Sequence, residues 1–361
     1  MKILHVINDL EIGGAQKLLH DLLLLQIADT STQPKCFVLR KSDSGLERDL
    51  KEKGVEIISA DAKAFSLATL KKLRRLIKEA DVVHAHLFPS NYLVALANAG
   101  SGKRLVFTEH STHNKRRDHA ILRLPEKIMY GRYDRLACIS GATAVNLTKW
   151  IGPNVAEPRI RIIHNGIDLS RFSKTMPQTP EEIFGRPGIP LLMISRFTAS
   201  KDHATAIKAL TFIENDDVFL AFAGDGETRQ EMERLAEECG VANRVKFLGS
   251  RSDTPELIRS TRIGIQSSNW EGFGLTAIEM MAGATPVIAS DVEGLNGVVK
   301  GAGILFTPGD EMALANEIKK LLSDQKLYED LQNRGKKRAA EYSISATAEK
   351  YKKLYQELAA R

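Results

Sequence analysis

Short apolar runs rich in β-branched residues alternate along this chain with amphipathic segments, and this alternation constrains the fold more than any other feature. The pattern is typical of βαβ units, in which parallel strands form one sheet with helices on both faces. The first half predicts strands at Lys2–Asn8, Cys36–Leu39, Glu56–Ser59, Val82–Ala85, Arg104–Thr108, Arg135–Ile139 and Ile160–His164. The second half predicts strands at Leu191–Ser195, Phe219–Ala223, Val245–Leu248, Ile263–Ser267, Pro286–Ala289 and Gly303–Phe306. The predicted fold class is α/β.

A chain of 361 residues is long enough for two domains. Proline resists both helices and central strands, so we place the linker at residues 176–190, where proline is dense. The first α/β domain is then residues 1–175 and the second is residues 191–342. Residues 343–361 predict a final helix with an apolar side. The prolines of the linker region are Pro177, Pro180, Pro187 and Pro190.

Composition excludes several classes of protein. Hydrophobic residues make up 43% and charged residues 27%, as in soluble globular proteins. No apolar run approaches the roughly 20 residues of a membrane span, and the chain opens directly on a strand, so neither insertion nor secretion is expected. The three cysteines are scattered, which favours neither disulfides nor a zinc site. We expect a cytoplasmic protein.

Charge is distributed unevenly between the two halves. Residues 1–180 contain 28 Lys and Arg against 18 Asp and Glu, whereas residues 181–361 contain 23 against 27. Basic runs such as Lys71–Arg75 and Lys115–Arg117 fit an anionic partner or simply a solvated helix face. No basic segment is interleaved with aromatic residues, so we expect no nucleic acid partner.

Ligands of open parallel sheets bind beyond the carboxyl ends of the strands, so the loops there are the candidate sites. Arg196 and Lys201 follow one strand of the second domain and together fit a diphosphate, although two surface cations would have the same pattern. Gly224 and Gly226 follow the next strand, in a loop suited to close approach by a ligand or to a tight turn.

The densest candidate is the loop and helix start from Glu271 to Glu279. Its backbone amides lie at a predicted helix N-terminus, where a diphosphate is electrostatically favoured. Glu271 falls in the loop before the helix and Glu279 about one turn inside it, so the two side chains would project at different depths of one cleft. They therefore predict separate roles, although helix capping remains an alternative for each. The residues between them that open the helix are Gly272, Phe273, Gly274 and Leu275.

In the first domain, Gly13 and Gly14 precede a helix, which suits an anion or a tight turn. A GxGxxG pattern is absent, which argues against a dinucleotide site. His110 follows the strand Arg104–Thr108, where it fits acid–base chemistry, hydrogen bonding or a solvated position.

Together these loops resemble the retaining, nucleotide-sugar-dependent glycosyltransferases of family 4. The resemblance spans nearly the whole chain and includes the family's E-x7-E signature, formed here by Glu271 and Glu279. It implies the GT-B architecture: two Rossmann-like α/β domains face a central cleft, and the C-terminal helix returns to the first domain. The other matching elements are Gly13-Gly14-Ala15-Gln16, Thr108-Glu109-His110, Asn165-Gly166-Ile167-Asp168, Arg196 with Lys201, and Gly224-Asp225-Gly226.

The resemblance also implies residue roles. Arg196 and Lys201 would hold the donor diphosphate in place of a metal, in agreement with the lack of an Asp-x-Asp motif, so no metal or other cofactor is expected. Glu279 would bind the ribose hydroxyls, and Glu271, with the amides after Gly272, would bind the donor sugar. The remaining implied donor contacts are the backbone of Arg251 at the base, the Gly224–Gly226 loop, and His110 with the Gly13–Gly14 loop from the first domain.

The implied function is retaining transfer of a sugar from a nucleotide sugar, with UDP the commonest carrier, to a saccharide or lipid-linked saccharide. Such an activity would serve cell-surface polysaccharide or glycolipid synthesis. Because lipid-linked acceptors lie at the membrane, the basic first domain would contact the anionic inner leaflet peripherally. An alternative enzyme is a nucleotide-sugar 2-epimerase of the same architecture, against which the E-x7-E pattern argues. A non-enzymatic alternative is a hinged solute-binding protein, which usually carries a secretion signal.

Overall fold

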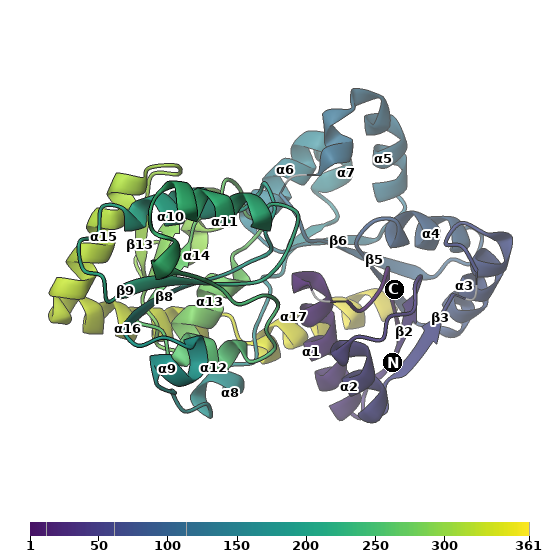
Figure 1. Cartoon of the computed structure of the whole chain (residues 1–361). Coiled ribbons are helices and arrows are strands. Elements are labelled where there is room, and N and C mark those ends of the chain that lie inside the picture. Colours follow the sequence, from purple (N-terminus) through teal and green to yellow (C-terminus); the bar gives the residue numbers. More distant parts are fainter. Residues whose placement is uncertain (12, 61, 113, 361) are drawn as a thin grey trace. The chain divides into compact units, whose positions relative to one another are not determined.

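The computed structural model describes residues 1–11, 13–60, 62–112 and 114–360, which form two compact α/β units (Figure 1). Unit 1 comprises Met1–Gly166 together with the C-terminal segment that begins at Ile344. Unit 2 comprises Ile167–Ser343. Each unit has its own parallel sheet and its own buried core.

Unit 1 contains a seven-stranded parallel sheet in the order β3-β2-β1-β4-β5-β6-β7. Its strands are β1 (Lys2–Ile7), β2 (Gln33–Val38), β3 (Glu56–Ser59), β4 (Val82–His86), β5 (Arg104–Glu109), β6 (Arg135–Cys138) and β7 (Ile160–Ile162). Its helices are α1 (Gly14–Ala28), α2 (Gly45–Glu52), α3 (Leu67–Glu79), α4 (Ser90–Ala97), α5 (Arg123–Tyr130), α6 (Gly141–Ile151), α7 (Pro153–Ala156) and α17 (Ile344–Ala359), with short 3₁₀ turns at Lys115–Asp118 and Ala120–Leu122.

Helix α17 completes the core of unit 1, although it is the last element of the chain. Its apolar side packs on one face of the sheet, where Tyr351 and Tyr355 are fully buried against residues of β1, β4, β5 and β6. It also lies beside α1, to which Lys352 is tied by an ion pair with Asp29 at 2.7 Å. A helix distant in sequence therefore closes one side of the first sheet.

Unit 2 contains a six-stranded parallel sheet in the order β10-β9-β8-β11-β12-β13. Its strands are β8 (Ile189–Ile194), β9 (Val218–Ala223), β10 (Val245–Phe247), β11 (Ile263–Gln266), β12 (Val287–Ser290) and β13 (Ile304–Phe306). Its helices are α8 (Ser170–Ser173), α9 (Pro180–Phe184), α10 (His203–Leu210), α11 (Arg229–Glu238), α12 (Thr254–Arg259), α13 (Leu275–Ala282), α14 (Asn296–Val299), α15 (Glu311–Ser323) and α16 (Gln325–Ala340), with a 3₁₀ turn at Ala242–Arg244. Within the described ranges, no helix of either unit combines the length and apolarity that crossing a bilayer requires.

The predicted α/β class is confirmed: each predicted strand coincides with an observed strand, and both sheets are parallel throughout. The observed division into units differs from the expected linker at residues 176–190, because the chain divides after Gly166. The proline-rich segment instead belongs to unit 2. Pro180 starts α9, where a capping box of Thr179 and Glu182 closes the first turn.

Pro190 lies inside β8, an interior strand, where proline was expected to be excluded. Alternate residues of a parallel strand direct their hydrogen-bonding groups to opposite neighbours. The carbonyl of Pro190 accepts a hydrogen bond of 3.0 Å from Arg262 N–H, while Ile189 N–H donates to Asp217 on the other side. A single missing N–H near the strand's start is therefore tolerated here.

The loops after β8 and β9 pack closely because of two glycines. Gly224 has φ +147°, and a Cβ there would lie 1.9 Å from the carbonyl oxygen of Ser195. Gly226 has φ +153°, and its Cβ would lie 2.3 Å from the carbonyl oxygen of Phe197. The backbone N–H of Phe197 donates to Asp225 across this contact at 3.0 Å. Because neither glycine has a side chain, the loop after β9 can pack directly against the backbone of the loop that carries Arg196.

Replacing Gly224 with Ala should destabilise unit 2, because the new methyl group would collide with the Ser195 carbonyl at a φ that L-residues rarely adopt. We expect a loss of about 2–3 kcal/mol in the free energy of unfolding, measured by urea denaturation. Gly297→Ala is the matched control, since no atom lies within 4 Å of its Cβ position. Equal losses in both variants would contradict the close-approach explanation.

Candidate functional site

In each sheet the strand order reverses beside the first strand, between β1 and β4 in unit 1 and between β8 and β11 in unit 2. Ligands of open α/β sheets bind at such switch points, beyond the carboxyl ends of the strands. In unit 2 the two flanking loops are residues 195–202 after β8 and residues 267–274 after β11. These loops contain six of the fourteen predicted site residues, namely Arg196, Lys201, Glu271, Gly272, Phe273 and Gly274.

Backbone and side-chain contacts join these two loops into one surface. Asn269 N–H donates to the carbonyl of Ser200 at 3.0 Å, and its side-chain amide donates to Ala199 at 2.9 Å. Lys201 and Ser268 form an isolated antiparallel bridge. Residues about seventy positions apart in the sequence thus form neighbouring parts of the site.

The predicted residues Lys201 and Glu271 meet in this surface as an ion pair between Nζ and Oε2. Both side chains are largely shielded from solvent, with exposures of 16% and 20%. The ammonium also donates to Ser268 Oγ at 3.4 Å. Sequence analysis selected both residues but did not predict that they pair, because that contact depends on the adjacency of β8 and β11.

Arg196, the other predicted cation, is exposed at the same edge of the sheet. No hydrogen bond or ion pair joins its guanidinium to any residue within the described part of the chain. Its backbone is held by its neighbours, since the Phe197 ring is buried and Ser195 lies in the loop contact with Gly224. The backbone of Arg196 is thus fixed by its neighbours, whereas its guanidinium is available to a ligand.

His203 supports this loop and was not selected from the sequence. Its Nε2 lies 2.9 Å from Ser195 Oγ, and its ring stacks on Phe197 with centroids 4.1 Å apart. Burial lowers the pKa of His203 to about 4, so the ring is neutral near pH 7. The only sequence signal was its position two residues after Lys201, at the start of a helix.

The loop after β11 opens helix α13 as predicted. Gly274 is the N-cap with φ +89°, Leu275 is the first helical residue, and Glu279 lies one turn further on, partly buried. The Gly272 N–H donates to Oε1 of Glu271 at 3.0 Å. Phe273 is buried, with its ring edge-on to Tyr342. Glu271 therefore lies in the loop before α13, whereas Glu279 lies inside the helix.

The loop after β12 packs behind this segment and was also missed. Gly294 has φ +91°, and a Cβ there would lie 2.3 Å from the Glu271 carbonyl oxygen. A Cβ on Gly274 would likewise lie 2.7 Å from the Leu295 side chain. The available signal was the Glu293-Gly294 pair, four residues beyond the predicted strand Pro286–Ala289.

Arg251 lies in the loop after β10, and its side chain is already paired. Its Nε donates to Asp253 Oδ1 at 2.7 Å, and a second guanidinium nitrogen contacts the other carboxylate oxygen. This hydrogen bonding lowers the pKa of Asp253 below its ordinary range. The arrangement leaves the backbone, rather than the guanidinium, as the part of Arg251 available to a ligand.

In unit 1, Gly13 is the N-cap of α1 and Gly14 its first residue. No side chain caps this end, and the first turn has no acidic residue. The side chain of Gln16 covers Gly13 so closely that a Cβ there would lie 2.4 Å from its Oε1. The start of α1, which follows β1, therefore has no side-chain cap on its backbone N–H groups.

His110 follows β5 at the same edge of this sheet and is partly exposed. Its Nε2 lies 3.3 Å from His86 Nδ1. The preceding residue, Glu109, is occupied by Arg117 at 2.6 Å and by the Tyr130 hydroxyl at 2.9 Å. Both contacts end on Oε2 of Glu109, and His110 has its Nδ1 left for a ligand among the described residues.

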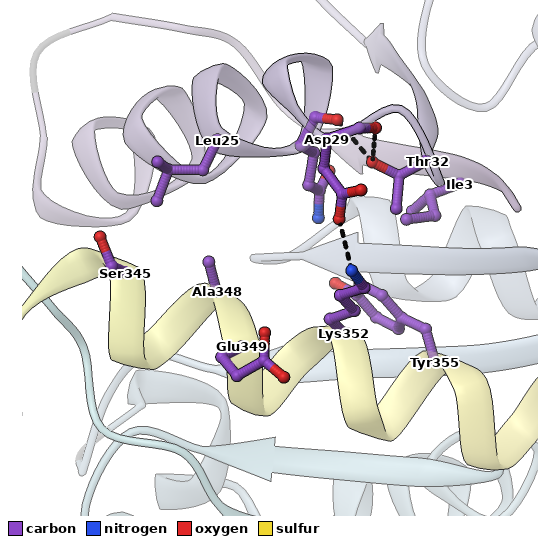
Figure 2. Close-up of a pocket in the computed structure, with 10 residues that line it drawn as sticks. Ile3, Leu25, Asp29, Thr32, Ser345, Ala348, Glu349, Lys352 and Tyr355 are labelled. Atoms are coloured by element: carbon purple, nitrogen blue, oxygen red, sulfur yellow. Dashed lines mark hydrogen bonds and ion pairs between the residues drawn. The ribbon is translucent and has the colours of Figure 1, made fainter.

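Unit 1 also has a pocket of about 150 Å³ between α1 and α17 (Figure 2). Ile3 and Thr32, which line it, lie at the amino ends of β1 and β2. The pocket is thus at the opposite edge of the sheet from the predicted loops. We do not assign the donor to it, since ligands of parallel sheets bind beyond the carboxyl ends.

Two family models match the chain. The model described as Glycosyltransferase Family 4 matches residues 12–171, and the model described as Glycosyl transferases group 1 matches residues 183–338. The two matched regions correspond closely to the two α/β units.

Individual proteins are similar over most of their length. The chain is 25% identical over 370 residues to the Campylobacter jejuni enzyme GalNAc-alpha-(1->4)-GalNAc-alpha-(1->3)-diNAcBac-PP-undecaprenol alpha-1,4-N-acetyl-D-galactosaminyltransferase, covering 99% of each chain. It is 26% identical over 322 residues to the D-inositol 3-phosphate glycosyltransferase of Corynebacterium urealyticum, covering 82% of this chain and 76% of that protein.

The fold is similar to that of Anabaena Alr3699/HepE, whose crystal structure was solved in complex with UDP and glucose. The TM-score is 0.87, the identity is 20%, and 99% of each chain is covered. At this identity the likeness shows the fold alone. With both halves matched by family models, the chain belongs to the family 4 glycosyltransferases and has the GT-B fold.

Proposed function

We propose that this glycosyltransferase moves a sugar, with retention at the anomeric carbon, from a UDP-sugar to a saccharide or lipid-linked saccharide acceptor. The observation that carries the proposal is the surface at the carboxyl ends of β8 and β11. There an exposed arginine, a lysine–glutamate pair and the glycine-opened start of α13 come from adjacent strands. Cations beside a helix N-terminus suit a diphosphate.

The donor diphosphate would lie between Arg196 and Lys201. At an effective dielectric constant of about 20, the attraction between two opposite unit charges about 4 Å apart is about 4 kcal/mol. Attraction of this kind to Arg196 and Lys201 would stabilise the negative charge that grows on the leaving diphosphate. We therefore propose that transfer needs no metal. Glu271, held by Lys201, would contact the donor sugar, and Glu279 would contact the ribose.

The donor base and the acceptor are proposed from relatives. The Anabaena protein was crystallised in complex with UDP, and the Campylobacter enzyme is named for an undecaprenol-linked acceptor. The first supports UDP as the carrier and the second supports a lipid-linked acceptor, and with such an acceptor this chain would serve the synthesis of cell-surface polysaccharide or glycolipid.

For the retained configuration we propose attack on the face from which the diphosphate departs. The leaving phosphate oxygen takes the proton of the acceptor hydroxyl, while the bond from the anomeric carbon to phosphate breaks and the new glycosidic bond forms. No side chain becomes glycosylated in this scheme, and the protein supplies position and charge.

An exposed apolar surface on unit 1 supports peripheral membrane contact. Ile121, in the 3₁₀ turn before α5, and Leu124 and Ile128, on α5, are 84%, 66% and 58% exposed. Arg123 and Lys127, on the same segment, are also exposed. Apolar side chains flanked by cations suit an anionic lipid interface, which would keep the enzyme beside a lipid-linked acceptor.

The two basic runs of unit 1 differ in what they offer to a membrane. On α3, Lys71, Arg74 and Arg75 are exposed and available to anionic headgroups. By contrast, Arg116 is paired with Glu126 at 2.8 Å, and Arg117 with Glu109. The two arginines of the second run are therefore paired within unit 1 and contribute to its structure.

Nucleotide binding tests the proposal directly. In a thermal-shift panel of UDP-, GDP- and ADP-sugars, a UDP-sugar at about 100 times its Kd should stabilise the chain by about 2.7 kcal/mol, with EDTA or with magnesium alike. Arg196→Gln should weaken binding by at least about tenfold, since a hydrogen bond to a charged group is lost. Arg234→Gln, an exposed arginine on α11, should bind as the wild type does. Binding that requires magnesium, or an unaffected Arg196→Gln variant, would refute the metal-free clamp.

The second prediction concerns Glu271. Glu271→Ala should lower the rate of transfer by at least about a hundredfold. Intact-mass spectrometry of this variant and of the wild type incubated with donor should reveal no sugar attached to the protein, and NMR of the wild-type product should show the donor's anomeric configuration. A glycosylated side chain or an inverted product would exclude the same-face mechanism. An epimerised free sugar formed without acceptor would instead indicate the epimerase.

The third prediction concerns the membrane. Wild-type protein should sediment with vesicles containing anionic lipid, and the triple variant Ile121→Ser/Leu124→Ser/Ile128→Ser should bind at least about tenfold more weakly. Met312→Ser, which removes an exposed apolar side chain from unit 2, is the control and should bind normally. Sedimentation independent of anionic lipid, or a variant that changes only self-association in light scattering, would count against lipid as the partner.

A further inference from the structure

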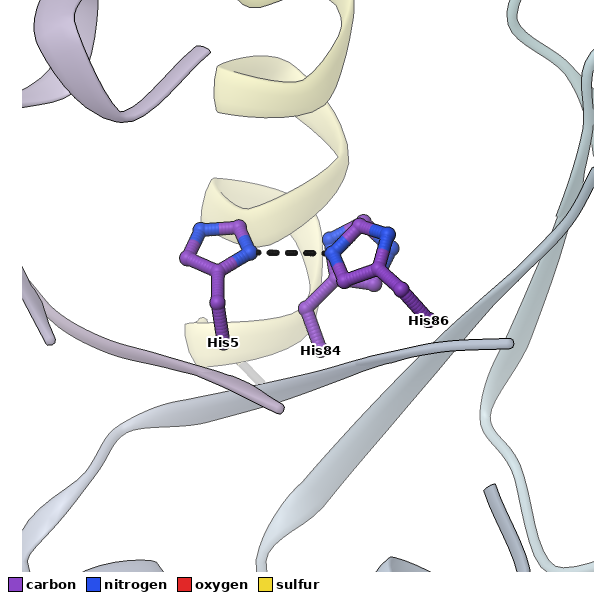
Figure 3. A group of neighbouring side chains, drawn as sticks. All are labelled: His5, His84 and His86. Carbon is purple, nitrogen blue, oxygen red and sulfur yellow. Dashed lines mark hydrogen bonds between the residues drawn. The ribbon is translucent and has the colours of Figure 1, made fainter. Parts of the chain in front are cut away.

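The polar core of unit 1 contains a row of side chains that the transfer chemistry above does not use. His5 lies on β1, His84 and His86 lie on β4, and His110 follows β5. His5, His84 and His86 are fully or almost fully buried beside α17 (Figure 3). Four imidazoles so close together need a complete set of hydrogen-bond partners.

Three contacts connect Gln26 of α1 to His110. Gln26 Oε1 lies 2.9 Å from His5 Nε2, and His5 Nδ1 lies 3.1 Å from His86 Nε2. His86 Nδ1 in turn lies 3.3 Å from His110 Nε2. The row therefore runs from the helix across the sheet to its carboxyl edge.

All members of the row are neutral near pH 7. Burial lowers the pKa of His5 and of His110 to about 4, and that of His86 well below its ordinary value. The neighbouring imidazoles of His5 and His84 depress the pKa of His86 further. A neutral imidazole has one N–H and one lone pair, so each ring can donate once and accept once.

Gln26 sets the direction of the row. The atom of Gln26 that faces His5 is the amide oxygen, 2.9 Å from His5 Nε2. An amide oxygen can only accept a hydrogen bond, so the hydrogen of this contact is on His5 Nε2. His5 Nδ1 then accepts from His86 Nε2–H, and His86 Nδ1 accepts from His110 Nε2–H.

The fourth histidine, His84, forms a side branch. Its Nδ1 lies 2.6 Å from the Tyr355 hydroxyl and its Nε2 lies 2.7 Å from Thr108 Oγ1, which is 3.0 Å from the Tyr351 hydroxyl. Both nitrogens of His84 are therefore occupied without any contribution to the row.

The nitrogens of His5, His84 and His86 lie within 4.8 Å of one another, as metal ligands would. A metal ion would need a lone pair from each ring. The lone pairs on Nδ1 of His5 and of His86 already accept a hydrogen bond from the N–H of the next ring. Both nitrogens of His84 lie within hydrogen-bond distance of a hydroxyl group. These matched donors and acceptors favour a hydrogen-bonded row over a metal centre.

We propose that Gln26 is a positioning residue, which acts through His5 and His86 to hold His110 as the neutral Nε2–H tautomer. His110 then presents its Nδ1 lone pair as a hydrogen-bond acceptor for a hydroxyl group of a sugar substrate. The hydroxyl assignment rests on the proposed function. Nδ1 has no hydrogen-bond partner among the described residues and lies on the side of the ring away from His86.

The consequence is a specific chemical role for His110. A neutral ring whose only N–H is committed to His86 cannot donate a proton to substrate. It orients a hydroxyl by accepting from it, and it does not act as a general acid. In this proposal His110 contacts the substrate, whereas Gln26 acts on His110 through the rings of His5 and His86.

Side-chain nitrogen NMR of the full chain labelled with ¹⁵N-histidine tests the row without any substrate. In the wild type near pH 7, His5, His86 and His110 should all give the Nε2–H tautomer. In Gln26→Met, His110 should shift towards the Nδ1–H tautomer, although three hydrogen bonds separate the two residues. Transfer kcat/KM should fall about fivefold, the equivalent of one neutral hydrogen bond, while nucleoside diphosphate affinity stays unchanged.

Tyr351→Phe is the matched control, because it removes a buried hydroxyl of the same cluster that lies outside the row. It should leave the His110 tautomer and kcat/KM as in the wild type. If Gln26→Met does not fold, the wild-type spectrum still decides, since an Nδ1–H form of His110 overturns the proposal. An unchanged His110 in folded Gln26→Met overturns it equally.

Two further measurements separate the alternatives. Elemental analysis that finds one equivalent of zinc in the purified chain, with histidine spectra that change on chelation, would replace the row by a metal centre. If the tautomers are as expected but no nucleotide sugar binds, the proposed function fails and the directional row stands.

Discussion

The parallel pairing of β8 with β11 is the interaction on which the candidate site depends. These strands are separated by β9 and β10 in the sequence, yet they lie side by side at the point where the strand order reverses. Their carboxyl ends bring Lys201 to Glu271 and place Arg196 at the same edge. Without this adjacency, the cations and the carboxylates would belong to unrelated loops.

Close backbone packing gives these loops their rigidity. Gly224, Gly226 and Gly294 each stand where a side chain would overlap a carbonyl oxygen of a neighbouring site loop. Their φ values lie in the region that L-residues rarely adopt, so the sequence requirement is conformational as well as steric. Glycines that resemble ligand contacts in a sequence thus also act as spacers between protein segments.

In unit 1, by contrast, buried polar side chains form a hydrogen-bonded network inside the core. Buried histidines, two tyrosine hydroxyls and the Gln26 amide exchange hydrogen bonds among β1, β4, β5, α1 and α17. Such a network is stable only when every donor finds an acceptor, which ties the last helix of the chain to its first strand. The partly exposed His110 lies at the end of this ordered network.

The sequence by itself determined the α/β class, the strands found among the described residues and the choice of candidate residues, because strand periodicity and loop chemistry are local properties. It did not show that the proline-rich segment 176–190 belongs to unit 2, because proline density says little about whether a segment packs against a sheet. Only the tertiary structure decided that Lys201 pairs with Glu271, that His203 and Gly294 support the site, and that four histidines form a cluster. The reason is that strand order and helix docking join residues far apart in the chain, and no local pattern encodes which strands become neighbours.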